Sequence, residues 1–169
     1  MTLENRIISL AKNSIARPSN VKIEVIINTI TVEEAALLKD RFGIQIEGYV
    51  RKIDNFSIIH TYKNHGNAVK EEKRGQVAIT VADFALIIEI AKVENSVYIG
   101  KNKLGRDCIL YRYKKENVYC YIEIRTGKKE IVMNTMYKIK PPENKRSGND
   151  VWHLQWIYPK TLPQCKYTT

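Results

Sequence analysis

Two of the three histidines in the chain lie five residues apart, in the stretch SIIHTYKNHG at residues 57–66. Imidazole exchanges protons near neutral pH, so His60 and His65 are the first candidates for general acid–base chemistry. A five-residue offset separates two side chains by about 140° around a helix, so the rings converge only if the helix unwinds near Gly66. The alternative is structural, with His65 capping a helix end and His60 filling a partly buried slot. Residue types and spacing leave both interpretations open.

Two further segments carry groups that suit a phosphate ligand. Arg74 follows a charged run and precedes a glycine, which lets the backbone approach a ligand, and its planar guanidinium matches phosphate geometry. In the stretch NTMYKIK, alternation puts Thr135 and Tyr137 on one face of a strand and Lys138 on the other. This polar pair indicates a lined groove, although an ordinary row facing solvent is the simpler explanation.

The cysteines and the lack of apolar runs limit the class of protein. Cys108, Cys120 and Cys165 show no zinc-ligand spacing, so we expect no metal site and no cofactor. An odd cysteine count without a disulfide framework favours a reducing compartment. The N-terminus lacks a secretory signal pattern, and no apolar run approaches the roughly 20 residues of a membrane helix. A cytoplasmic protein with no membrane partner is therefore expected.

Charge points to a polyanionic partner. The 169 residues include 28 Lys and Arg against 18 Asp and Glu, which gives a formal net charge of +10. Such an imbalance favours nucleic acid first and an anionic membrane second. A basic surface can also serve solubility alone, so the charge does not decide the function.

The elements that must position these groups divide into helices and then strands. Period-two patterns at 96–100, 106–115, 117–126 and 129–140, joined by turn-sized links, predict a four-stranded antiparallel meander. The predicted fold is α+β, with the N-terminal helices packed on one face of this meander. Helices are predicted at 2–15, from Thr31 to about Arg41, from a cap at Asp54 or Asn55 to about His65, and after Thr80; a strand is predicted at 21–27, an extended or loop-like segment at 43–53 and a polar loop at 68–76.

In this order and spacing, the motifs IIHTYKNHG, EEKRGQVAITVADFALI and IVMNTMYK resemble the phage-associated barnase/EndoU/colicin/RelE-like nucleases. The resemblance covers about residues 43–140, and the segment before it looks like the usual lead-in to this domain. It implies one or two helices against a four-stranded antiparallel sheet. The expected organisation is a lead-in at 1–42, a nuclease domain at 43–140 and a polar tail at 141–169, which includes Trp152, His153 and Trp156.

The resemblance also implies a chemistry and a set of site residues. Members of the family cut RNA, without a metal ion, by attack of the ribose 2′-OH on the adjacent phosphate. His65 would be a catalytic acid or base with His60 as the second, and Arg74 would bind the scissile phosphate. The remaining expected contributors are Thr135 and Tyr137 in the catalytic site and Lys63, Lys73, Gln76 and Lys138 as substrate-binding residues.

The function expected from these observations is a metal-independent RNA endonuclease that acts on tRNA or mRNA as a toxin or phage effector. An inhibitor or immunity protein is a possible partner, and delivery into a target or host cell is conceivable. Two other classes stay open: an inactive RNA-binding module, and a structural or interaction domain of a phage particle. A nuclease requires His65, Arg74 and Thr135 to converge, whereas a binding module requires only a broad basic face.

Overall fold

The computed structural model of the chain describes residues 1–141, so almost all of the predicted tail at 141–169 lies outside the described residues. The helices are α1 (Leu3–Ala16), α2 (Val32–Phe42), α3 (Asn55–His65), α4 (Ala68–Lys73) and α5 (Ile87–Ile90), with 3₁₀ helices η1 (Val81–Leu86) and η2 (Val93–Asn95). The strands are β1 (Glu24–Thr29), β2 (Val50–Asp54), β3 (Gln76–Val77), β4 (Ser96–Lys101), β5 (Asp107–Lys114), β6 (Val118–Arg125) and β7 (Glu130–Ile139).

Capping residues determine where α2 begins and ends and where α3 begins, as the sequence predicts. The Thr31 hydroxyl accepts a hydrogen bond from the Glu34 backbone N–H at 3.1 Å and starts α2. Gly43 ends α2 in the left-handed conformation, which a glycine adopts without steric cost. The Asp54 carboxylate accepts from the Ser57 N–H at 2.8 Å and starts α3.

The four predicted strands form the meander β4–β5–β6–β7, and all three of its pairings are antiparallel. The predicted four-stranded sheet is nevertheless incomplete, because the sheet of the described residues has seven strands in the order β1-β2-β7-β6-β5-β4, with β3 also paired to β7. β2 lies parallel to β7 although residues 55–129 separate the two strands in sequence. No local pattern specifies so distant a pairing. The sequence therefore predicts only an extended or loop-like segment at 43–53.

Two short regions also differ from the prediction. Residues 68–76 were expected to be a loop, but Asn67 caps the helix α4 by accepting a hydrogen bond from the Lys70 N–H. The charged composition of this segment concealed the helix. The segment after Thr80 begins as the 3₁₀ helix η1 and only then becomes the short α5.

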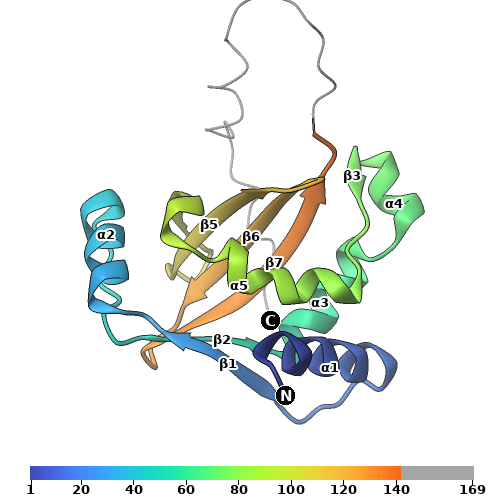
Figure 1. Cartoon of the computed structure of the whole chain (residues 1–169), viewed down its shortest axis with the longest axis horizontal. Coiled ribbons are helices and arrows are strands. Elements are labelled where there is room, and N and C mark those ends of the chain that lie inside the picture. Colours follow the sequence, from blue (N-terminus) through green and yellow to red (C-terminus); the bar gives the residue numbers. More distant parts are fainter. Residues whose placement is uncertain (142–169) are drawn as a thin grey trace, which may run out of the picture.

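The helices α1, α3 and α5 cover one face of the sheet (Figure 1). The main hydrophobic core lies between them and the sheet, and it joins residues on both sides of position 42, from Ile7 and Leu38 to Tyr121 and Met136. Because strand side chains alternate, Cys120 and Ile122 point to the opposite face, where they belong to a second, smaller cluster.

Strand β7 has different neighbours along one side. β2 pairs with its first part, Glu130–Val132, and β3 pairs with its end, Lys138 and Ile139. Between these pairings, α3 packs against β7. The helix that carries both histidines therefore lies along the middle of the strand that carries Thr135 and Tyr137.

Candidate active site

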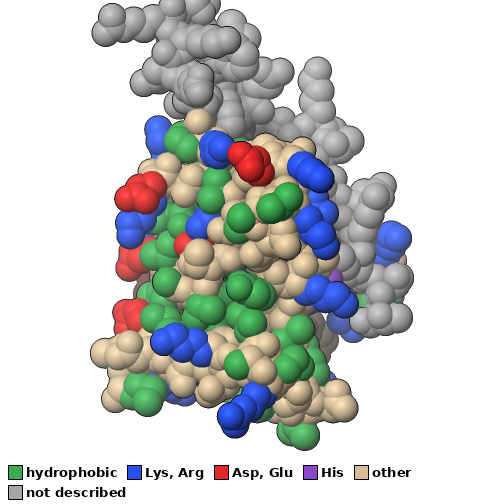
Figure 2. All heavy atoms as spheres, turned by 90° about the vertical axis from the view of Figure 1, so that its right-hand side faces the viewer, with side chains coloured by type: hydrophobic (Ala, Val, Ile, Leu, Met, Phe, Trp, Pro, Cys, Tyr) green, Lys and Arg blue, Asp and Glu red, His purple; other side chains and the backbone are tan. Residues whose placement is uncertain are grey.

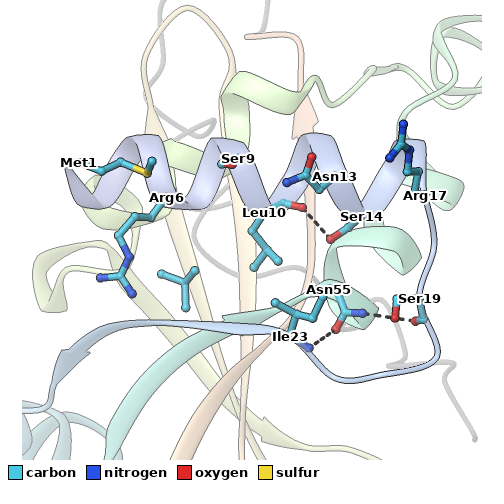
Figure 3. A pocket seen from close by; sticks show the side chains of 11 residues that line it. Met1, Arg6, Ser9, Leu10, Asn13, Ser14, Arg17, Ser19, Ile23 and Asn55 are labelled. Atoms are coloured by element: carbon cyan, nitrogen blue, oxygen red, sulfur yellow. Dashed lines mark hydrogen bonds between the residues drawn. The ribbon is translucent and has the colours of Figure 1, made fainter.

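The start of α3 is anchored before the helix reaches its histidines. The Asn55 side chain accepts a hydrogen bond from the Ile23 N–H at 2.9 Å and donates to the carbonyls of Val21 and Ser19. The bonds of Asn55 to Ile23 and Ser19 lie at one end of a hollow of about 560 Å³ between α1 and β1 (Figure 3). Neither histidine lines this hollow. Asn55 matters for the site because its bonds fix the start of α3 beside β1.

His65 ends α3 and is held by a buried carboxylate. Its Nδ1 lies 3.0 Å from Oε2 of Glu71, whose side chain is fully buried. Arg74 donates from Nη1 to Glu71 Oε1 at 2.8 Å and to the Asn64 carbonyl at 3.1 Å. A Cβ at position 66 would lie 2.5 Å from the Tyr62 carbonyl oxygen, so glycine is required where the chain leaves α3. Glu71 makes Nδ1 the donor and leaves Nε2 of His65 for proton exchange.

The His65 ring lies against Tyr137 of β7, with 5.7 Å between the ring centroids. Thr135, two residues earlier on the same face, is buried, and its Oγ1 has no hydrogen-bond partner in the described part of the chain. Arg112 is opposite Cys120 in the register, and Cys120 is opposite Tyr137, so the three side chains share this face. Nε and Nη1 of Arg112 are also buried, without a hydrogen-bond partner from the described residues. Unsatisfied donors in a row beside an imidazole suit an anionic ligand.

Burial affects the two ionisable groups beside Arg112. It raises the pKa of the Tyr137 phenol, and the neighbouring Cys120 raises it further. Burial likewise raises the pKa of the Cys120 thiol, and the positive charge of Arg112 offsets part of this rise. Tyr137 therefore keeps its proton at neutral pH and is a hydrogen-bond donor at this face.

His60 lies on another side of α3, and the helix does not unwind before His65, so the rings point in different directions. His60 lines an open hollow of about 750 Å³ together with Phe56 and Ser57 of α3 and Met133 and Asn134 of β7. Burial is the main cause that lowers the pKa of His60, and the positive charges of His65 and Lys63 lower it further. His60 is therefore mainly neutral at pH 7.

The lowered pKa of His60 predicts that acid destabilises the fold. Since the folded pKa lies below the value of about 6.5 for an exposed imidazole, the unfolded chain binds the proton more readily, and stability falls as pH drops through this value. We expect the melting temperature to fall between pH 7 and pH 5, and to fall less in His60→Gln. Parallel thermal scans of both proteins measure the difference. Equal slopes would contradict the burial of a neutral His60.

The four expected substrate-binding residues lie in different surroundings. Lys63 and Lys73 are exposed, and Gln76 at the start of β3 has a buried Oε1 that no donor among residues 1–141 meets. Lys138 is buried on the other face from Tyr137, and its Nζ lies 2.8 Å from Asp83, which also accepts from Tyr119. Lys138 thus ties β7 to η1.

Three residues of this region were not singled out by the sequence. Glu71 lies in a charged run, which is typical of a solvated surface. The available signal was Asn67, because a helix that begins there would have one buried side. Arg112 lies on the same strand face as Cys108 and Leu110, because the three alternate along the strand. A cation on this otherwise apolar face was the signal that could have identified it. Asn134 gave no signal.

Lys and Arg side chains are spread over the face that includes α4 and the neighbouring helix ends (Figure 2). Within residues 1–141, no three His, Cys, Asp or Glu side chains are grouped to hold a metal ion. Nor is any helix in that part of the chain long and apolar enough to cross a membrane.

The chain matches the model of a known protein family. The family described as phage-Barnase-EndoU-ColicinE5/D-RelE like nuclease3 matches residues 28–146, which is more than half of the chain. The match begins within the expected lead-in segment and spans both histidines and all of β7. No curated protein and no solved structure matches the chain.

Proposed function

We propose, from the premise that this chain belongs to the phage-Barnase-EndoU-ColicinE5/D-RelE like nuclease family, that it is an RNA endonuclease. Membership of the family makes nucleic acid the substrate. The choice of RNA over DNA rests on the chemistry of the site, in which two imidazoles can serve an attack by a ribose 2′-OH. The net charge of +10 supports binding to a phosphate backbone.

The observation that carries the proposal is the row of groups along β7. His60 shares a hollow with Asn134, Thr135 follows with a hydroxyl that has no hydrogen-bond partner among residues 1–141, and Tyr137 contacts His65. We place the phosphate beside Thr135, with one imidazole on each side. An in-line displacement at phosphorus uses a base on the attacking side and an acid on the leaving side, and this placement would supply both.

The environments of the two histidines support a separate role for each in this proposal. His60, neutral at pH 7, removes the proton from the 2′-OH, and the 2′-oxygen forms a bond to phosphorus. The bond from phosphorus to the 5′-oxygen breaks, and Nε2 of His65 gives its proton to that oxygen. The products are a 2′,3′-cyclic phosphate and a free 5′-OH.

Two arginines and a phenol stabilise the charge that collects on the phosphate. Arg112 offers Nε and Nη1, which have no hydrogen-bond partner within residues 1–141, and Tyr137 offers its O–H. Nη1 of Arg74 donates to Glu71 and Asn64. The Arg74 side chain is half exposed, so its other donors can meet the phosphate. Preorganised donors of this kind are often the largest single contribution to catalysis.

Incubation of total tRNA with the full chain in EDTA tests this proposal. We expect discrete fragments that end in 2′,3′-cyclic phosphate, because proton transfer by imidazole needs no metal ion. A substrate with one 2′-deoxy nucleotide at the cleaved position should resist cleavage there, and the matching DNA should stay intact.

Other results would contradict the proposal in distinct ways. Cleavage that disappears in EDTA, or cleavage of the 2′-deoxy substrate, would rule out attack by the 2′-OH. A shift of tRNA on a native gel without any fragments would identify an RNA-binding module.

A further inference from the structure

The hollow beside His60 has features that the cleavage reaction does not use. It holds about 750 Å³ and is open to solvent, and Phe56 on its wall is 44% exposed. Ser57 and Asn134 add hydrogen-bonding groups to the same wall, and Ile124 and Val132 make part of it apolar. An exposed aromatic ring beside amide and hydroxyl groups matches the two parts of a nucleobase, which has an apolar face and a polar edge.

A β-bulge brings Asn134 into this hollow. Ile122 pairs with Thr135 and Glu123 pairs with Met133, so the register shifts at Asn134, which is the extra residue of β7. A bulge redirects a side chain that regular alternation would send elsewhere, and bulges are over-represented next to active sites. Here the redirected side chain carries an amide, which can both donate to and accept from the edge of a base.

We propose that this hollow is the subsite for the nucleotide whose 2′-OH attacks the phosphate, with Phe56 stacking on its base and Asn134 reading the edge of that base. The inference rests on the proposed function, because His60 can take the 2′-OH proton only from a ribose held beside it. Asn134 is then a specificity-determining residue, and Phe56 is a sequence-tolerant contact.

The rim of the hollow also fits an RNA strand that continues beyond this nucleotide. Arg106 and Lys128 line it, and neither side chain makes a hydrogen bond or ion pair within residues 1–141. Lys22, by contrast, is bound to Glu24 and Asp54 at 3.2 and 3.6 Å. Arg106 and Lys128 are therefore available for the phosphates on the 5′ side.

Cleavage of four short RNAs that differ only at the nucleotide 5′ of the cut bond tests the subsite. Asn134→Ala should reduce the ratio of kcat/KM between the best and worst base by about tenfold, the effect of losing a hydrogen-bonded base contact. Phe56→Leu should raise KM for all four substrates by about tenfold, since stacking is lost but the apolar contact that supports folding is kept. Phe56→Trp should restore KM.

A matched control is Val32→Ala, which truncates an exposed apolar side chain in the first turn of α2, away from the hollow. It should leave KM and base preference unchanged. Titration of the full chain with each nucleoside 3′-monophosphate, followed by NMR, measures the subsite without cleavage. Binding there should weaken in Phe56→Leu.

The two experiments separate this inference from the proposed function. Binding of nucleoside 3′-monophosphates that depends on Phe56, in a chain that cuts no RNA, would retain the subsite and refute the nuclease. Cleavage with unchanged KM and base preference in Phe56→Leu and Asn134→Ala would refute the subsite and retain the nuclease.

Discussion

His65→Asn is expected to lower kcat/KM for RNA cleavage by about 10²–10⁴-fold while the chain stays folded, the usual contribution of one general acid or base. The asparagine amide nitrogen occupies a position close to that of Nδ1 and can still donate to Glu71 Oε2, which His65 meets at 3.0 Å. Asparagine has no group at the position of Nε2 that could exchange a proton with the substrate. Steady-state kinetics on a short RNA and a thermal scan of each protein measure the two effects.

His65→Ala is the matched comparison, because it removes the ring and also leaves Glu71 short of one partner. Glu71 is fully buried, so this variant should melt at a lower temperature than His65→Asn while cleaving equally poorly. Cleavage by His65→Asn within a few fold of the native rate would show that His65 only caps α3. Both histidines would then return to the structural interpretation.

Much of the fold could be predicted because its signals are local. Thr31, Asp54 and Gly43 determine helix ends through bonds to residues three or four positions away, and the meander follows from alternation and short links. The remaining strands depend on distant partners. β2 pairs with β7 across about 80 residues of chain, and nothing in residues 50–54 specifies that partner.

The candidate site shows the same division. The histidines and the Thr135–Tyr137 pair could be found from residue type and spacing, because chemistry limits which side chains move protons or bind phosphate. Glu71 could not be found in this way, since its importance comes from the burial of α4 against α3. Asn134 could not be found either, because a bulge depends on the register between two strands and not on either strand alone.

Glu71→Gln is the second change expected to have a large effect, because this carboxylate holds both His65 and Arg74. Its two oxygens lie 3.0 Å from His65 Nδ1 and 2.8 Å from Arg74 Nη1. The amide keeps the volume but removes the charge, and its NH₂ group must face one of these donors. Breaking a buried ion pair costs about 3–5 kcal/mol, and we expect about 3 kcal/mol because the Arg74 side chain is half exposed. Urea unfolding measures this loss.

Stability alone would not distinguish a positioning residue from a structural brace, so the cleavage rate and its rescue decide between them. In Glu71→Gln the amide can donate to Nδ1, which moves the proton of a neutral His65 to Nε2 and reverses the tautomer that the carboxylate selects. We therefore expect kcat to fall by about 10–100-fold, the usual effect of losing the partner that orients a histidine. Glu71→Asp, which keeps the charge, should recover most of kcat. A loss of stability in Glu71→Gln with an unchanged kcat would mean that Glu71 braces α4 against α3 and does not control the proton on His65.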